Sequence, residues 1–204
     1  MSARAGQGVG VLIPAAGAAR RMRGRDKLLE PVAGHPLLAV VVARACAAAG
    51  RVLVTLGPGM ALRRAALHGQ PAACTEIAGA AEGMAASVRA GAVWATEQGL
   101  AGLMVLPADM PDIAAQDLVG MVAAFQAADP SPILRATTAD GRPGHPVILP
   151  ARHFAAMAGL RGDAGARDIL RVHRSEVAAH PLPGTRAITD LDTPEDWAAW
   201  RALR

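Results

Sequence analysis

The stretch VGVLIP, residues 9–14, is a continuous apolar run that ends in a loop rich in alanine and glycine. Such a run predicts a β-strand that is buried on both faces, as inner strands of parallel sheets are. Residues 52–56 (VLVTL) and 102–106 (GLMVL) have a similar character. Because alanine-rich helical stretches separate these runs, the three together predict a parallel sheet whose strands are connected by helices.

The rest of the chain continues this alternation of strands and helices. We expect helices over residues 36–49, 60–67, 83–97, 115–128, 151–157, 164–172 and 194–203. We expect further strands over residues 73–77, 132–137, 146–149, 177–179 and 187–189. This order predicts an α/β fold, a three-layer sandwich with helices on both faces of a mostly parallel sheet, as a single domain over residues 1–204. Ligands of such sheets bind at the carboxyl ends of the strands.

The composition narrows the classes of partner. The 204 residues carry a net charge of +4 and give a pI of about 10.3. The basic residues are scattered and tyrosine is absent, so the sequence predicts neither a base-stacking surface nor a nucleic-acid partner.

No apolar run is long enough to cross a membrane, and the first residues lack a signal-peptide pattern. The two cysteines lack zinc or redox spacing, so we expect a reducing, cytoplasmic location.

Lys27 is the only lysine in a chain with 21 basic residues. A lysine ammonium is a compact point charge, whereas the arginine guanidinium is a planar fork. All the remaining basic residues are arginines, so the single lysine suggests that an ammonium is required at position 27. We expect this group to contact a small polyanion.

Lys27 ends a loop, residues 14–27, that follows the first buried strand. Small residues at 15–19 leave the backbone uncovered, so a phosphate chain can approach its N–H groups, and several arginines follow. The loop is not a P-loop, because no Gly-Lys-Ser/Thr leads into a helix. It is not a dinucleotide fingerprint either, because Gly6, Gly8 and Gly10 precede the strand. The pattern indicates a different kind of triphosphate site.

Two acidic segments are candidates for binding a metal ion. Asp109 stands between Pro107 and Pro111 just after the buried strand 102–106, where stiff flanking residues can hold a carboxylate in place. One or two carboxylates plus substrate phosphates are the usual ligands of Mg²⁺. Residues 190–196 (DLDTPED) predict a helix start with Thr193 as the N-cap, and either Asp190 or Asp192 is available as a further carboxylate.

Together these segments predict nucleotidyl transfer, which needs neutralised phosphates, a bridging metal ion and an acceptor held in line. A phosphate monoester acceptor is largely ionised at pH 7, because its second proton has a pKa near 6. It therefore needs little help from a general base. The sequence accordingly shows no obvious histidine–carboxylate pair for this purpose.

The chain resembles the small nucleotidyltransferases of molybdenum cofactor maturation, most closely the molybdopterin cytidylyltransferases. The resemblance extends almost from end to end, and six motifs occur in the family's order. They are PAAG…RRM…G…DK (14–27), GMAASV (83–88), DMP (109–111), GRPGHP (141–146), GDAGAR (162–167) and DLDTPED (190–196). A single motif of this kind is weakly specific, whereas six in order are a strong signal.

The resemblance implies a Rossmann-like nucleotidyltransferase fold of the GT-A type. It also implies Mg²⁺-dependent transfer of CMP from CTP to the terminal phosphate of molybdopterin, which gives molybdopterin cytosine dinucleotide and pyrophosphate. A molybdoenzyme is the implied client of this product. The choice of CTP rests on Ala16, because the guanylyl-transferring relatives have an L-x-G-G pattern at this place.

The resemblance also implies roles for individual residues. The implied nucleotide-binding residues are Ala15, Ala16, Gly17, Arg21, Lys27, Gly83 and Ser87, and the implied catalytic residues are Arg21, Lys27 and Asp109. Ser87 and His145 would border the acceptor, while Asp109 and Asp192 would hold Mg²⁺.

Other functions remain as alternatives. The chain could transfer a guanylyl or another nucleotidyl group to a different small phosphorylated acceptor, or shelter and deliver a cofactor without catalysis. A nicotinamide-dependent oxidoreductase is disfavoured, because no strand is followed by G-x-G-x-x-G. The histidines His68, His153, His173 and His180 lack ligand spacing in the sequence, so we expect no metal role for them.

Overall fold

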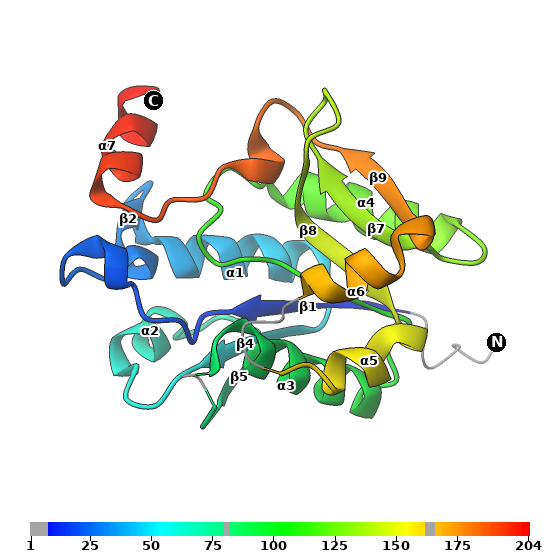
Figure 1. The fold of residues 1–204 in the computed structure, drawn as a ribbon. Helices are drawn as coiled ribbons and strands as arrows, with labels where there is room; N and C mark the ends of the chain where they lie inside the picture. Colours follow the sequence, from blue (N-terminus) through cyan, green and yellow to red (C-terminus); the bar gives the residue numbers. More distant parts are fainter. Residues whose placement is uncertain (1–7, 80–81, 162–165) are drawn as a thin grey trace.

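A computed structural model describes residues 8–79, 82–161 and 166–204, and these residues form an α/β fold with a seven-stranded, mostly parallel sheet (Figure 1). The strand order is β5-β4-β1-β6-β8-β7-β9. Strand β8 pairs antiparallel with both of its neighbours, and the other neighbouring pairs are parallel. The strands are β1 (Val9–Pro14), β4 (Val52–Leu56), β5 (Ala73–Glu76), β6 (Gly102–Val105), β7 (Ile133–Thr137), β8 (Pro143–Pro150) and β9 (Val177–Pro181).

Helices cover both faces of the sheet and make the three layers that the sequence predicts (Figure 1). Helices α1 (Leu37–Ala48) and α4 (Ala115–Ala127) pack on one face, while α3 (Met84–Glu97), α5 (Phe154–Ala158) and α6 (Ala166–Val172) pack on the other. Helix α2 (Ala61–Ala66) follows β4, and α7 (Pro194–Ala202) follows the last loop. No helix in the described ranges is long and apolar enough to cross a membrane.

Side chains alternate between the two faces of each strand, and this alternation explains why the sheet has a hydrophobic core on both sides. In β1, Val11 and Ile13 pack into the cluster beneath α1 and α4, whereas Leu12 between them packs into the cluster beneath α3 and α5. Both sets of side chains are fully buried. Successive side chains of a strand point to opposite faces, so a strand with helices on both sides must be apolar throughout. This is the physical reason why the unbroken VGVLIP run predicts the fold correctly.

The structure corrects one predicted strand. Residues 187–189 are not a strand: residues Arg186–Ile188 form the 3₁₀ helix η6, with the Ile188 N–H donating to the Thr185 carbonyl. This helix lies directly against β8, because a Cβ on Gly144 would stand 1.9 Å from the carbonyl oxygen of Ala187. Only a glycine allows backbones to approach this closely.

Other boundaries differ less from the prediction. Strand β8 begins at Pro143 and not at residue 146. The short antiparallel pair β2 (Pro31–Val32) and β3 (His35–Pro36) was not predicted. The predicted start of helix 164–172 and most of the GDAGAR motif lie outside the described residues, and α6 is described from residue 166.

The loop after β1 is fastened to the C-terminal helix through Glu30. This buried carboxylate accepts hydrogen bonds from Arg25 at 2.5 Å and from Arg201 of α7 at 2.8 Å. Burial alone would raise the pKa of Glu30, but the two arginines outweigh it and hold the pKa below its ordinary value of 4.5. The contact joins two segments that are 171 residues apart in the sequence.

We expect Glu30→Gln to lower the free energy of unfolding at pH 7 by about 1–3 kcal/mol, because two charged hydrogen bonds to a buried group are lost. Since the pKa of Glu30 is lower in the folded state, its stabilisation is complete above pH 4.5 and disappears as the pH falls through the folded pKa. Urea denaturation across this pH range measures the difference, which should narrow in acid. Glu195→Gln, in an exposed pair with Arg23, is the control and should cost about 0.5 kcal/mol or less. Equal losses in both variants would contradict the assignment.

Candidate active site

Three loops meet at the carboxyl ends of β1 and β6. The first runs from Ala15 to Glu30 and contains the 3₁₀ helices η1 (Arg20–Met22) and η2 (Lys27–Leu29). The second follows β6 and carries Asp109. The third leads into α7 and carries Asp192. The carboxyl ends of parallel strands meet at one edge of the sheet, so the topology itself collects these segments.

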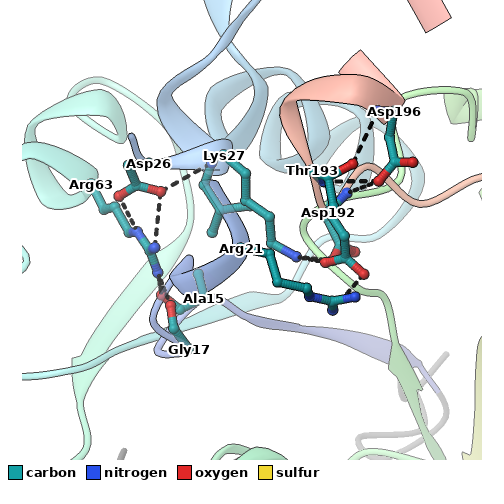
Figure 2. A network of polar contacts seen from close by, with 11 residues as sticks. Ala15, Gly17, Arg21, Asp26, Lys27, Arg63, Asp192, Thr193 and Asp196 are labelled. Carbon is teal, nitrogen blue, oxygen red and sulfur yellow. Dashed lines mark hydrogen bonds and ion pairs between the residues drawn. The ribbon is translucent and has the colours of Figure 1, made fainter. Parts of the chain in front are cut away.

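Lys27 lies between two carboxylates that come from distant parts of the chain. Its Nζ donates to Asp109 Oδ2 at 2.5 Å and to Asp192 Oδ1 at 2.6 Å. The three side chains are 17–19% exposed. Arg21, which is largely exposed, contacts the other oxygen of Asp192 at 2.6 Å (Figure 2). The structure thus brings together four residues that the sequence selects.

Local interactions hold each of these charged groups in place. Asp26 caps η2 by accepting from the Leu28 N–H, which fixes the backbone at Lys27. The Thr193 hydroxyl accepts from the Asp196 N–H, and the Asp196 carboxylate accepts from the Thr193 and Asp192 N–H groups. These contacts form a capping box at the residue that the sequence predicts as the N-cap, and they orient the backbone at Asp192.

The loop that carries Asp109 is tied to its surroundings through the backbone. Arg44 of α1 donates to the carbonyls of Pro111 and Ile113 at 2.6 and 2.9 Å. The Leu191 N–H donates to the Asp109 carbonyl at 3.1 Å, which joins the two acidic loops directly. The carboxylates therefore approach Lys27 from rigid positions.

The charged groups of the site are close together and partly buried, and both conditions shift their pKa values. Burial alone would lower the pKa of Lys27, but Asp109 and Asp192 outweigh it and raise the pKa above its ordinary value. Burial would raise the pKa of Asp192, but the hydrogen bond and charge of Lys27 and the charge of Arg21 lower it. The pKa of the nearby Asp190 is raised, first by burial and then by the like charges of Asp109 and Asp192. The site thus contains more carboxylates than one ammonium neutralises.

This donor set fits a hard divalent cation. The carboxylates of Asp109 and Asp192 already converge on one cation, the Lys27 ammonium. A third carboxylate, Asp190, has a pKa that is raised first by burial and then by the charges of these two. Oxygen ligands of this kind suit Mg²⁺, which is held by one or two carboxylates together with substrate phosphates.

A cavity of about 180 Å³ opens beside this charged cluster. Its lining includes six of the residues that the sequence selects: Ala15, Gly17, Lys27, Gly83, Ser87 and Asp109. The other lining residues are Pro14, Ala18, Leu28, Met84, Pro107 and Ala108. The lining thus combines small residues, which leave backbone accessible, with the Lys27 ammonium and the Asp109 carboxylate.

Gly83 and Ser87 belong to the start of α3. Gly83 is the residue before the helix and has φ 86° and ψ −153°, a conformation that side chains disfavour. Ser87 lies in the first turns of α3 and is buried. The exposed N–H groups at such a helix start are suited to binding anions.

Ala16 and His145 do not line this cavity. The Ala16 side chain is buried against Ile77 and Ala86. His145, on β8, has a buried Nδ1 without a hydrogen-bond partner among the described residues. Burial, followed by the charge of Arg135, lowers the pKa of His145, while the charge of Asp109 opposes this shift. The His145 imidazole on β8 is therefore close enough to the loop after β6 for the charge of Asp109 to affect its pKa.

Arg63 is a buried member of the site that the sequence analysis missed. It is 3% exposed, and its Nε and a terminal nitrogen pair with both oxygens of Asp26 at 2.7 and 2.9 Å. Its other terminal nitrogen donates to the carbonyls of Ala15 and Gly17 at 2.5 and 2.9 Å (Figure 2). Arg63 turns these carbonyls inward and joins them to the residue that caps η2. It is a positioning residue for the loop of residues 15–27.

The sequence offered no clear signal for Arg63. It stands next to Arg64 on the short helix α2, in a chain where arginine is common. Its partners lie 37 and about 47 residues away, and only the packing of α2 against η2 brings them together.

Comparisons with known proteins agree with this geometry. The family model described as the MobA-like NTP transferase domain matches residues 11–178. The crystal structure of Rv0371c from Mycobacterium tuberculosis is 26% identical, with a TM-score of 0.81 and coverage of 96% of this chain and 98% of that one. Rv0371c in complex with manganese has a TM-score of 0.74 and the same identity, with coverage of 95% and 97%. A search of curated proteins finds no match.

A more distant structure has the same fold. A nucleotidyl transferase from Methanothermobacter is 19% identical, with a TM-score of 0.75 and coverage of 96% of each chain. The fold, the family match and the charged cluster at the strand ends define a nucleotidyltransferase with a Rossmann-like fold. The chain belongs to the MobA-like NTP transferase family.

We expect Arg63→Met to lower the free energy of unfolding by about 3 kcal/mol, because it leaves the Asp26 carboxylate and two inward carbonyls without their partner. Arg64→Met is the matched control: Arg64 is half exposed and lies 3.8 Å from Glu76 in an exposed pair. Its loss should cost less than about 1 kcal/mol. Thermal and urea denaturation of the two variants measure both values. A cost for Arg63→Met as small as that of the control would show that Arg63 does not hold the loop.

Proposed function

We propose that this chain catalyses Mg²⁺-dependent transfer of CMP from CTP to the terminal phosphate of molybdopterin, with release of pyrophosphate. The observation that supports this most is the Lys27 ammonium held between Asp109 and Asp192, beside a cavity with an uncovered backbone wall. The resemblance of the six sequence motifs to the molybdopterin cytidylyltransferases supports the choice of substrates. A phosphorylated pterin and a client molybdoenzyme are the corresponding partners.

In this proposal the triphosphate enters the cavity and takes over the Lys27 ammonium as its counter-ion. Lys27 and Arg21 neutralise phosphate oxygens, while backbone N–H groups at Gly17 and Gly83, which line the cavity, donate to them. Asp109 and Asp192, once free of Lys27, would hold Mg²⁺, which would supply positive charge to offset that of the leaving pyrophosphate. The protein residues mainly position charges and phosphates.

The bond changes balance without a protein base. An oxygen of the acceptor's terminal phosphate attacks the α-phosphorus of CTP, and the bond from that phosphorus to the β-bridging oxygen breaks. The acceptor phosphate is already mostly deprotonated at pH 7. Ser87 and His145 would border the acceptor and orient it, and the lowered pKa of His145 keeps its ring neutral near pH 7.

The choice of CTP also concerns a relative of the same fold and the position of Ala16. A CMP-2-keto-3-deoxy-manno-octonic acid synthetase of the same fold is complexed with CTP, at 14% identity and a TM-score of 0.73. Ala16 packs against Ile77 and Ala86, so in this proposal it affects the base through the shape of the backbone and not through a polar contact. Cytoplasmic location and magnesium, as opposed to manganese, belong to the same proposal.

A nucleotide panel tests the proposal. Pyrophosphate release is measured with CTP, GTP, ATP and UTP in turn, each with Mg²⁺ and with a phosphorylated pterin or a phosphorylated sugar. We expect release only with CTP and the pterin. Pyrophosphate release with another nucleotide or acceptor would support a nucleotidyltransferase with a different specificity. Binding of the pterin without pyrophosphate release with any nucleotide would favour a cofactor carrier.

We expect Lys27→Ala and Asp109→Asn each to lower kcat by at least about 100-fold, because each removes a charge that acts on the phosphates or the metal ion. Glu195→Gln removes a carboxylate from the same edge of the molecule, three residues after Asp192, and should retain activity. Circular dichroism establishes that the variants are folded. Near wild-type turnover in a folded Lys27→Ala protein would refute the assignment.

A further inference from the structure

A second group of possible metal ligands lies at the opposite edge of the sheet. His153 follows β8, the antiparallel strand, so it stands near the amino ends of the parallel strands. Glu176 ends the 3₁₀ helix η5 (Arg174–Glu176), directly before β9 starts at the same edge. His173 precedes η5. Asp109 and Asp192 lie near the carboxyl ends, so these three residues form a separate cluster.

The three side chains converge closely. Glu176 Oε1 lies 2.7 Å from His173 Nδ1, and Glu176 Oε2 lies 3.2 Å from His153 Nε2. One ligand atom from each residue can be chosen so that all lie within 4.8 Å of one another. The two imidazole rings are in edge contact, with centroids 4.5 Å apart. His153 is 4% exposed, so its position is fixed by the surrounding core.

We infer that His153, His173 and Glu176 form a binding site for a divalent transition metal ion, with zinc as the best match. Two imidazole nitrogens and one carboxylate oxygen are a ligand set that zinc accepts, with a fourth position for water. Imidazole nitrogens favour zinc over Mg²⁺, whereas the all-oxygen cluster at Asp109 favours Mg²⁺. Ligand chemistry therefore separates the two sites.

Arg152 fits this arrangement as a group that orients the carboxylate. It donates to Glu176 Oε2 at 2.7 and 3.1 Å and to the Ser131 carbonyl at 2.8 Å. Oε1, on the side of His173, remains for the metal ion. Carboxylates that bind metals are commonly held by such an outer hydrogen bond. Arg152 also places a positive charge near the ion, which limits the affinity that we expect.

The site would have a structural consequence independent of the proposed transfer reaction. His153 directly precedes α5, and His173 directly follows α6, so one ion would join both ends of the segment that covers this face of the sheet. An ion that binds the folded state and not the unfolded state stabilises the fold by mass action. Without a metal ion, the same residues would form only a hydrogen-bonded clamp around Glu176.

Isothermal titration calorimetry of the metal-free protein with zinc chloride distinguishes a metal site from a hydrogen-bonded clamp without metal. We expect a site with a dissociation constant of roughly 10 µM or tighter and a rise in Tm on zinc addition. His173→Ala and Glu176→Gln should each weaken this site by at least about tenfold, while magnesium chloride should not occupy it. Circular dichroism checks that both variants are folded.

Two controls keep the outcome specific. His68→Ala removes an exposed histidine outside the cluster and should leave zinc binding unchanged. Asp109→Asn should also leave it unchanged, which distinguishes this site from the candidate active site and makes the result independent of the proposed function. The inference is overturned if the wild-type protein binds no zinc in this range, if His173→Ala and Glu176→Gln both retain the wild-type affinity, or if Asp109→Asn abolishes binding.

Discussion

The contact of one ammonium with two carboxylates organises the carboxyl edge of this molecule. Lys27, Asp109 and Asp192 are each less than one-fifth exposed, and partly buried charges of this kind are stable only when they are paired. The pairing joins loops that are 82 and 165 residues apart in the sequence. In the proposed function the same three groups bind the triphosphate and the divalent ion, so one interaction would serve both the fold and the chemistry.

Arginines that bond to carbonyls and carboxylates extend this principle around the site. Arg63 holds the loop after β1 through its carbonyls, and Arg201 ties α7 to Glu30. Arg44 holds the loop that carries Asp109, and Arg186 pairs with the buried Asp117 of α4. Several arginines of this basic chain thus serve as internal clamps. The high pI therefore reflects structural roles as well as the requirements of a phosphate site.

The two edges of the sheet have different chemistry. The carboxyl edge combines carboxylates, an ammonium and uncovered backbone, which are groups that bind phosphates and hard cations. The amino edge combines two histidines with one glutamate. Membership of the MobA-like NTP transferase family accounts for the first edge, because nucleotide chemistry belongs to the carboxyl ends of such sheets.

The sequence by itself determined the inner strands, the α/β alternation and the residues around Lys27, because apolar period, helix caps and glycine positions act over a few neighbouring residues. It also placed Asp109 and the capped start of α7 correctly. Only the tertiary structure decided that Arg63 reaches Ala15 and Gly17, that residues 186–188 form a 3₁₀ helix against Gly144, and that His153 meets His173 and Glu176. These contacts depend on how distant segments pack. No local pattern encodes a partner that is brought near only when helices and strands assemble.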